Sequence, residues 1–498
     1  MKIKIESPIN KYYVQTLCMI FFPGSKFSDD EEEGAEHSLF LRTTSDDEGI
    51  SSYARMTYMG KTTEAEQRAE YNPTRTKERT LKLAVGLAVL SCGVSMLGYR
   101  PAWGMLVGVR PSKVATEMLN SGMSKTKVKK TLTSDYLVIP KKAALAVDVA
   151  LNEKRIAGTS TPKDCSMYIS IPFCPSRCTY CSFVSYTSKR LLSLIPAYLE
   201  RLLADLETNF KIIKDLGLRL RTIYIGGGTP TILDAEQLRR LLSKINEHTD
   251  ATALEEFTLE SGRPDTITEE KLTIAKEYGV TRVCVNPQTL CDEILCGIGR
   301  SHTVEDFYAA YELARRSGIK TVNVDLIAGL PGDNFKNFAK TIDNVLRLEP
   351  ENITVHTFCV KKSAEIRKAN SDVYSASDTD TGKCVDYAQI KASQNLYIPY
   401  YMYRQKNSVG NYENVGFSKE GHEGLYNIYM MEELHSIFAV GAGAVTKLVD
   451  NVSTDGKGCD KKIVRLFNQK YPYEYLEEDR SEEFYKAAID FYTEHNMI

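Results

Sequence analysis

Short apolar segments alternate with longer segments of mixed polarity through the middle of the chain. The apolar segments have the length of buried strands. They lie at 166–171, 221–226, 255–260, 281–286, 321–327 and 352–358. The segments between them predict helices at 189–217, 234–247, 268–278, 303–318 and 334–348. Strands interleaved with helices in this way favour right-handed crossovers and a parallel sheet, so we expect an α/β fold.

The regions that flank this alternation follow other patterns. Short alternating segments predict a small N-terminal sheet with strands at 2–6, 12–22, 38–42 and 53–59. Helices are predicted at 77–97, 111–121, 124–132 and 140–153, with Ser112 and Ser124 as N-cap residues of the second and third. Residues 369–395 are polar and then helical, and strands at 397–403 and 436–440 and an amphipathic helix at 481–494 follow.

These changes of pattern divide the chain into four predicted parts. They are an N-terminal α+β domain (1–100), a helical segment (101–160), the α/β region (161–365) and a C-terminal α+β extension on the substrate side (366–498). The chain has 498 residues, 43% of them hydrophobic and 26% charged, which is ordinary for a globular protein. Because its net charge is −2, we expect no nucleic-acid partner.

One stretch, residues 83–97, has no charged residue for fifteen positions. It is shorter than the roughly 20 apolar residues that span a bilayer, so we expect a buried helix and no membrane span. The start of the chain, MKIKIESPIN, has no apolar core of a secretory signal. Twelve cysteines are too sparse for a disulfide scaffold in a chain of this length. We therefore expect a cytoplasmic protein in which clustered cysteines bind a metal.

Three cysteines carry the most specific chemical signal. Cys174, Cys178 and Cys181 are spaced C-x3-C-x2-C in the loop after the strand predicted at 166–171. Such a triad can bind three irons of a 4Fe–4S cluster and leave the fourth iron open. The alternative is a zinc loop, which normally has four ligands in C-x2–4-C pairs. Cys165 is the nearest further cysteine upstream, and no histidine lies between 165 and 190, so the spacing favours the open cluster.

The cysteine motif and the segments after it resemble the radical S-adenosylmethionine (SAM) superfamily. Within it they are similar to the oxygen-independent coproporphyrinogen III oxidase (coproporphyrinogen dehydrogenase) family, HemZ type. The resemblance runs from about residue 100 to residue 450. The matching segments are MYISIPFC (167–174), YIGGGTPT (224–231), Glu260, NPQT (286–289), GRSHT (299–303), NVDLIAGLP (323–331) and AVGAGA (439–444).

The resemblance implies a partial (β/α)6 barrel at 161–365 with a 4Fe–4S cluster and SAM as cofactors. The cluster would deliver one electron to SAM, giving methionine and a 5′-deoxyadenosyl radical. The residues that it assigns to SAM are Tyr168 near the sulfonium, Tyr180 beside the adenine, Gly227, Gly228 and Thr229 at the amino-acid end, Glu260 on the ammonium, Arg300 on the carboxylate, and Gln288, Asp325 and Val445 as further contacts. The residues alone leave structural alternatives open: a tight turn, an ion pair at the rim and core packing.

The activity that the resemblance implies is oxidative decarboxylation of two propionates of coproporphyrinogen III to vinyls. It needs an external electron donor and acceptor, and we expect a monomer. Basic side chains should meet the substrate carboxylates, and the candidates are Arg263, Lys361, Lys362 and Arg404.

One departure keeps a second function open. Phe183 stands where characterised oxidases of the family have a fourth cysteine, and the related haem chaperones share this phenylalanine. The chaperones have a His-Asn-rich stretch that ends in Tyr-Trp, whereas residues 422–430 here contain no tryptophan. The missing tryptophan disfavours the chaperone, and a radical-SAM-like haem carrier is kept as the alternative because of Phe183. His302 and His356 are expected at the ligand edge, while haem ligation by His422 or His435 has no support from spacing.

Overall fold

A large open sheet forms the centre of the computed structural model, which describes residues 1–28, 37–73, 75–181, 185–359, 379–405, 408–450, 462–495 and 497. Eleven strands follow the order β11-β12-β10-β9-β8-β7-β6-β5-β13-β14-β15. The six predicted strands are confirmed as β5 (Asp164–Ile171), β6 (Arg219–Gly227), β7 (Glu256–Leu259), β8 (Arg282–Cys284), β9 (Thr321–Ala328) and β10 (Asn352–Thr357). They are parallel and adjacent in chain order, as a partial (β/α)6 barrel requires.

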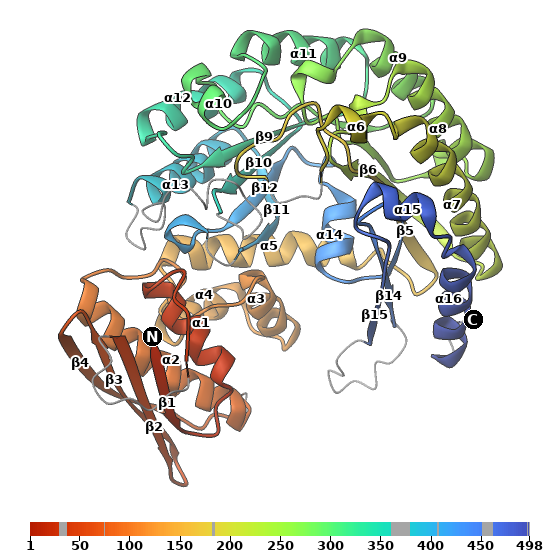
Figure 1. Ribbon diagram of the computed structural model, residues 1–498. Coiled ribbons are helices and arrows are strands. Elements are labelled where there is room, and N and C mark those ends of the chain that lie inside the picture. Colours follow the sequence, from red (N-terminus) through yellow and green to blue (C-terminus); the bar gives the residue numbers. More distant parts are fainter. Residues whose placement is uncertain are drawn as a thin grey trace.

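Helices cover the outside of this sheet, which curves into an open arc (Figure 1). The predicted helices are confirmed as α7 (Ile195–Asp215), α8 (Ala235–His248), α9 (Glu269–Glu277), α11 (Val304–Arg316) and α12 (Phe335–Arg347). The segment predicted as one helix at 189–217 is divided, because a short helix α6 (Lys189–Leu192) ends before Pro196 opens α7. A further short helix, α10 (Asp292–Gly297), was not predicted.

The C-terminal part adds strands to both edges of the same sheet. On one edge β11 (Ile398–Tyr403) and β12 (Asn414–Ser418) run antiparallel. On the other, β13 (Ser436–Val440) pairs parallel with β5, and β14 (Val445–Val449) and β15 (Ile463–Phe467) continue as an antiparallel ribbon. The helices of this part are α13 (Thr379–Gln394), α14 (Leu425–Met431), α15 (Pro472–Glu477) and α16 (Ser481–Glu494).

A second, smaller sheet lies at the N-terminus. It has the order β1 (Lys2–Glu6), β2 (His37–Ser45), β3 (Gly49–Tyr58) and β4 (Lys61–Glu70). The strand predicted at 12–22 is wrong, because this segment forms helix α1 (Lys11–Phe21). Its buried residues Val14, Leu17, Cys18 and Phe21 recur at helical spacing, and the side chain of Asn10 caps its first turn.

The apolar helix α2 (Lys77–Leu97) belongs to the core of this N-terminal sheet. It is long and apolar enough to cross a membrane, but 67% of its most apolar window is buried inside the protein. It packs against β3, β4 and α1. A Cβ atom on Gly93 would lie 2.3 Å from the ring of Phe21, so this glycine permits the close contact between the helices. The burial agrees with the expected core helix.

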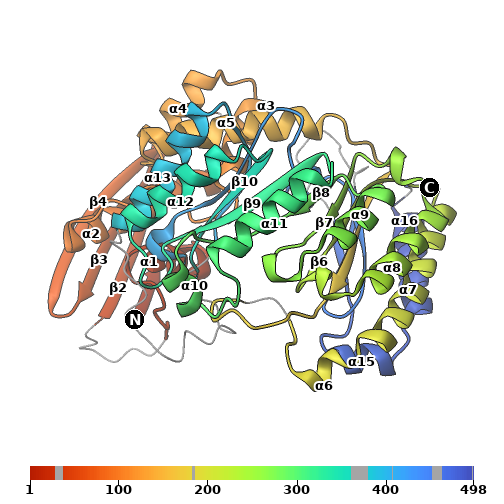
Figure 2. The same cartoon turned by 90° about the horizontal axis from the view of Figure 1, so that it is seen from above.

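The helical segment between the two sheets consists of α3 (Pro111–Asn120), α4 (Lys125–Ser134) and α5 (Pro140–Ala157). Ser124 caps α4 as predicted. Ser112 does not cap α3, because that helix begins one residue earlier at Pro111 and has Arg110 as its N-cap. In Figure 1 α5 crosses the open side of the arc, where it contacts β11 and α14, and Figure 2 shows it beside α3 and α4.

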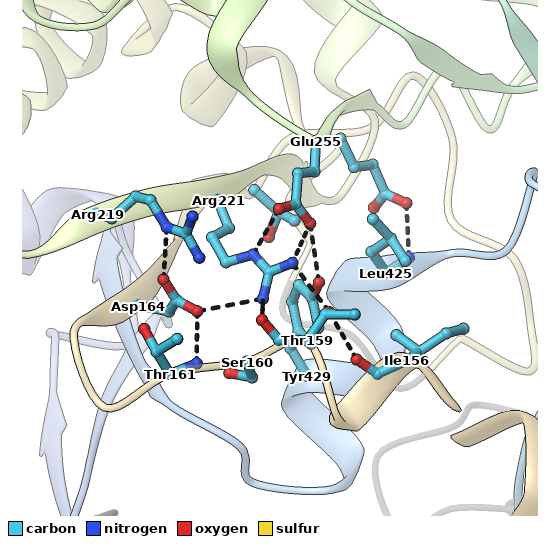
Figure 3. Close-up of polar contacts among 12 residues, drawn as sticks. Ile156, Thr159, Ser160, Thr161, Asp164, Arg219, Arg221, Glu255, Leu425 and Tyr429 are labelled. Atoms are coloured by element: carbon cyan, nitrogen blue, oxygen red, sulfur yellow. Dashed lines mark hydrogen bonds and ion pairs between the residues drawn. The ribbon is translucent and has the colours of Figure 1, made fainter. Parts of the chain in front are cut away.

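A network of charges ties the amino ends of the parallel strands together (Figure 3). The Arg221 guanidinium donates to both carboxylate oxygens of Glu255 at 2.8 and 2.5 Å. It also donates to Asp164 Oδ2 at 3.2 Å and to the carbonyl oxygen of Thr159 at 3.0 Å. Arg219 donates to the other oxygen of Asp164 at 2.7 Å. Burial alone would raise the pKa of Asp164, but hydrogen bonds from Arg219 and from the Thr161 amide outweigh it and lower that pKa.

Candidate functional site

A cavity of about 860 Å³ opens at the carboxyl ends of the parallel strands. That edge is where ligands bind in parallel α/β folds, and the volume is within the usual range for ligand pockets. The cavity brings together all the residues predicted to bind the cofactors. They are Tyr168, Cys174, Cys178, Tyr180, Cys181, Gly227, Gly228, Thr229, Glu260, Gln288, Arg300, Asp325 and Val445.

Backbone hydrogen bonds fix the cysteine loop at its first cysteine and between its second and third cysteines. The amide of Cys174 donates to the carbonyl of Tyr186 at 3.1 Å, and the amide of Thr179 donates to that of Ile298 at 3.0 Å. Cys174 and Cys178 are buried, and Cys181 is half-buried. The sulfur of Cys174 lies 3.3 Å from Thr229 Oγ1, which brings the loop next to the glycine turn.

Two positions of the glycine turn require glycine, one because of this close contact and one because of its backbone conformation. A Cβ atom on Gly228 would lie 2.5 Å from the carbonyl oxygen of Phe173, inside the cysteine loop. Gly227 holds φ at +107°, a conformation that side chains other than hydrogen disfavour. The glycines are thus required by the packing of the loop, and they also line the cavity.

Two carboxylates on the cavity floor are held in different environments. Asp325 accepts hydrogen bonds from Asn323 at 2.7 Å and from Asn286 at 2.9 Å, and its Oδ2 lies 3.7 Å from His356 Nε2. Burial opposes its ionisation, but His356 and hydrogen bonds from Asn323 and Thr354 lower its pKa overall. Asp325 lies in a mostly apolar strand, and the amides that bond it also line the cavity.

Glu260 is the second carboxylate, and its pKa lies near neutral pH. It accepts a hydrogen bond from the Tyr224 hydroxyl at 3.1 Å. Burial, followed by the nearby charge of Asp325, raises the pKa of Glu260 to about 7. A cationic group that entered the cavity would favour the ionised form of Glu260.

Arg300 lies in the wall of the cavity and holds neighbouring loops in place. It donates to the carbonyl oxygens of Asn286 at 3.0 Å and Gly262 at 3.1 Å, and to the Tyr180 hydroxyl at 3.2 Å. Its Nε and the side-chain oxygen of Gln288 are buried without a partner among the described residues. Gln288 also has a φ of +72°, which is uncommon outside glycine. Both orphaned atoms suit a polar ligand.

Three tyrosines form an aromatic wall that the sequence revealed only in part. The rings of Tyr168 and Tyr224 lie 6.1 Å apart, and those of Tyr224 and Tyr426 lie 4.8 Å apart. Tyr168 was predicted. Tyr224 lies two positions before Gly226 on β6, so strand alternation could have placed it on the same face. Tyr426 comes from α14, whose position over the sheet has no sequence signal.

Of the four basic side chains predicted to meet the substrate, one lies away from the cavity, one lines it and two lie outside the described residues. Arg404 is wrong as a cavity residue, because it is buried against the helical segment and donates to the carbonyl oxygens of Leu106 and Gly108. Arg263 lines the cavity, but its guanidinium is held in an ion pair with Asp265 at 3.1 Å. Lys361 and Lys362 lie outside the described residues, as does Phe183.

The histidines also take distinct positions. His356 lines the cavity, with Nδ1 3.4 Å from the Tyr403 hydroxyl. His302 is buried and does not line it. His422 and His435 contact hydroxyls instead: His422 meets Thr321 at 2.8 Å, and His435 meets Ser160 and Ser166 at 3.1 and 2.8 Å.

The donor set fits a cluster better than a single metal ion. In the described part of the chain, no three His, Cys, Asp or Glu side chains are grouped to hold one metal ion. Three thiols nevertheless face one cavity. A 4Fe–4S cluster bonds each cysteine to a different iron, so its ligands need not converge on one point.

Comparison with known proteins agrees with this chemistry. The Radical SAM superfamily model matches residues 168–345. The chain is 32% identical to the oxygen-independent coproporphyrinogen-III oxidase-like protein HemZ of Bacillus subtilis (strain 168), over 93% of this chain and 92% of that protein. It is 32% identical to the heme chaperone HemW of the same organism, over 64% of this chain and 80% of HemW. The solved structure of Escherichia coli coproporphyrinogen III oxidase (HemN) covers 68% of this chain and 73% of its own, with 20% identity and a TM-score of 0.49.

Proposed function

Because this chain belongs to the radical SAM superfamily and to its coproporphyrinogen-III oxidase-like HemZ family, whose cofactors are a 4Fe–4S cluster and SAM, we propose that Cys174, Cys178 and Cys181 bind the cluster. When bound, the cluster and SAM supply a one-electron cleavage that yields a 5′-deoxyadenosyl radical. Glu260 and Arg300 bind the ammonium and carboxylate of SAM. Tyr168 orients the sulfonium with its ring face, and Tyr180, bonded to Arg300, flanks the adenine.

The remaining predicted residues complete this binding set. Gly227, Gly228 and Thr229 hold the amino-acid end of SAM against the cysteine loop. Asp325 is ionised and accepts a ligand hydroxyl, and the orphaned oxygen of Gln288 accepts a second polar group. The cavity shields these groups from water, which strengthens each electrostatic contact.

The reaction that we propose is oxidative decarboxylation of coproporphyrinogen III to protoporphyrinogen IX. At each of two propionates the β-carbon loses a hydrogen atom, carbon dioxide leaves, and an external acceptor takes one electron. The observation that carries this proposal is the extent of the cavity beyond the cofactor residues. Its wall continues through apolar and aromatic side chains suited to a flat macrocycle: Phe358, Tyr401, Tyr403, Met430, Met431 and Phe467.

The test is an anaerobic incubation of reconstituted protein with SAM, a reductant, an electron acceptor and coproporphyrinogen III. Porphyrins are separated after oxidation. We expect protoporphyrin that requires SAM and disappears in Cys181→Ala. The absence of decarboxylation, under conditions where a known oxidase turns over, contradicts the proposal.

The second candidate is a haem carrier, and the similarity to HemW supports it. In the described chain His356 is the histidine that lines the cavity, so it is the haem ligand to test. Stable one-to-one haem binding without decarboxylation, lost in His356→Ala, favours the carrier. The cytoplasmic location and the monomeric state stay predictions.

A further inference from the structure

The ribbon of β14 and β15 presents four side chains to the cavity. Its register pairs Val445 with Phe467 and Lys447 with Arg465. Residues two apart on a strand share a face, so these four residues form one surface, which we call the ribbon face. All four line the cavity. The two ends of this face differ in chemistry, since one pair is apolar and the other is cationic.

The two cations of the ribbon face share a carboxylate. Like charges directly opposite each other in an antiparallel pair are unfavourable, so an anion is needed between them. Glu433 supplies it: its Oε1 lies 3.1 Å from Lys447 Nζ and 3.8 Å from Arg465 Nη2. A third cation, Arg110, lies 3.8 Å from Glu433 Oε2 and 3.3 Å from Glu432 Oε1.

The local charges do not cancel. Three cations (Arg110, Lys447 and Arg465) face two carboxylates (Glu432 and Glu433) among the described residues. Burial and the charge of Glu432 raise the pKa of Glu153, a carboxyl nearby, well above its usual value, which disfavours this group as a third anion. These distances thus join three cations to two carboxylates. The Arg465 side chain is 48% exposed, and its 3.8 Å distance from Glu433 Oε1 is longer than that of Lys447.

The apolar pair separates this charge from the cysteine loop. Val445 comes directly after the turn at 441–444, and that turn follows β13, which runs parallel to β5 toward Cys174. Lys447 and Arg465 lie two residues, about 7 Å, further along the ribbon. Phe467 is 59% exposed, which is unusual for a large apolar side chain. The face therefore matches an apolar ring edge that ends in an acidic side chain.

We propose that the ribbon face binds a carboxylate side chain of a flat, apolar polycarboxylic acid, with Arg465 and Lys447 on the carboxylate and Phe467 against the ring, while Val445 remains the SAM contact at the apolar end of the face. This proposal rests on the proposed function, for which the acid is a tetrapyrrole and the carboxylate a propionate. Glu433 competes for the same cations, so the ligand displaces part of an existing ion pair. That competition favours ligands with a strong, exposed carboxylate.

The experiment measures anaerobic binding of coproporphyrin III and of its tetramethyl ester to the reconstituted protein by fluorescence. We expect Arg465→Gln and Lys447→Gln each to weaken coproporphyrin binding about tenfold and to leave ester binding within twofold. Glu433→Gln removes the competing anion and should tighten coproporphyrin binding. Lys462→Gln is the matched control, because Lys462 directly precedes β15, is exposed and does not line the cavity.

The outcomes separate the two proposals. Coproporphyrin binding that is unchanged in Arg465→Gln, Lys447→Gln and Glu433→Gln overturns the ribbon face but leaves the proposed function standing. Failure of the unmodified protein to bind either porphyrin, while SAM still binds, counts against the tetrapyrrole function itself. SAM affinity also reports folding of each variant, since none of these side chains is assigned to SAM.

Discussion

The amino and carboxyl edges of the parallel strands in the large sheet both carry buried polar groups. These groups are hydrogen-bonded at the amino edge, whereas, in the described part of the chain, some of them lack partners at the carboxyl edge. At the amino edge, the Arg221 guanidinium is bonded by Glu255, Asp164 and Thr159 (Figure 3). At the carboxyl edge, the described residues leave Gln288 Oε1 and Arg300 Nε without a partner. The same residue types therefore stabilise the fold at one edge and remain open to a ligand at the other.

The difference has an energetic meaning. A buried polar atom without a partner costs about 1–3 kcal/mol, which a bound ligand recovers. A buried charge that is paired on every side costs little until one partner is removed. We therefore expect substitutions at the amino edge to change the free energy of unfolding, and substitutions at the carboxyl edge to change ligand binding.

The largest expected effect is loss of the cluster from the carboxyl edge. Replacing Cys174, Cys178 and Cys181 together by alanine should abolish the iron and sulfide content of anaerobically reconstituted protein. The unmodified protein should give an electron paramagnetic resonance spectrum that changes when SAM is added. Cys165→Ala is the matched control, because Cys165 is buried near the amino end of β5. A cluster that assembles in the triple variant contradicts the assignment.

The amino edge should respond in the opposite way. Arg221→Ala leaves Asp164 buried with fewer partners, and we expect the free energy of unfolding to fall by about 3–5 kcal/mol. Denaturant unfolding of the protein without cofactors measures this change. Arg239→Ala breaks an exposed pair with Glu277 and should cost less than about 1 kcal/mol. Equal losses in the two variants would remove the distinction between buried and exposed pairs.

How far the sequence predicts the molecule depends on whether a signal is local. The six parallel strands and the cysteine loop carry their patterns within a few residues, and they were predicted. The small sheet was harder, since β4 reads KTTEAEQRAE and buries only Ala69 along its length. The position of β4 in the sheet depends on its pairing with β3, because β4 has no apolar periodicity of its own.

The candidate site follows the same rule. Glu260 and Asp325 could be predicted because they lie in short segments that match the pattern of the family. Lys447 and Arg465 could not, because the register of β14 with β15 pairs residues separated by a long connection. Arg404 illustrates the converse error: its charge suggested a substrate contact, but tertiary packing buries it beside Leu106.

The third prediction returns to the carboxyl edge. Arg300→Ala should weaken SAM binding by about 1.5–3 kcal/mol, the contribution of a hydrogen bond to a charged group. Calorimetry of reconstituted protein measures this, with iron content as the check on the cluster. Tyr180→Phe removes the hydroxyl that Arg300 bonds but keeps the ring, so it should cost less. Unchanged affinity in Arg300→Ala would assign this arginine to loop packing alone.

A smaller effect is expected from the titration of Glu260. Because its pKa is raised to about 7, the folded protein holds this proton more tightly than the unfolded chain does. The stability that protonated Glu260 gives to the folded protein is therefore lost as the pH rises from 4.5, the usual pKa of a glutamate, through 7. Binding of the SAM ammonium needs the carboxylate, so affinity should fall up to tenfold per pH unit below about 7. Glu260→Gln should bind more weakly and lose this dependence, and a wild-type profile that is flat between pH 5.5 and 8 contradicts it.

The smallest expected effect concerns Arg263, which the sequence offered as a substrate contact. Its Nη1 lies 3.8 Å from the sulfur of Cys178 and 3.3 Å from the carbonyl oxygen of Ser176, inside the cysteine loop. Its Nη2 donates to Ser301 Oγ at 2.7 Å and to Asp265 Oδ2 at 3.1 Å, and its Nε donates to Asp265 Oδ1 at 3.1 Å. Hydrogen bonds to cluster sulfurs favour the reduced, more negative state.

Arg263→Gln should therefore lower the midpoint potential of the reconstituted cluster. A three- to tenfold change in the one-electron equilibrium corresponds to about 30–60 mV. Asp265→Asn removes the opposing charge and should raise the potential, a reversal of sign that loop packing alone does not produce. Redox titration followed by electron paramagnetic resonance measures both shifts, and iron content confirms that the cluster is intact. If both variants moved the potential in the same direction, Arg263 would belong with Arg221, as a residue that stabilises the fold without tuning the chemistry.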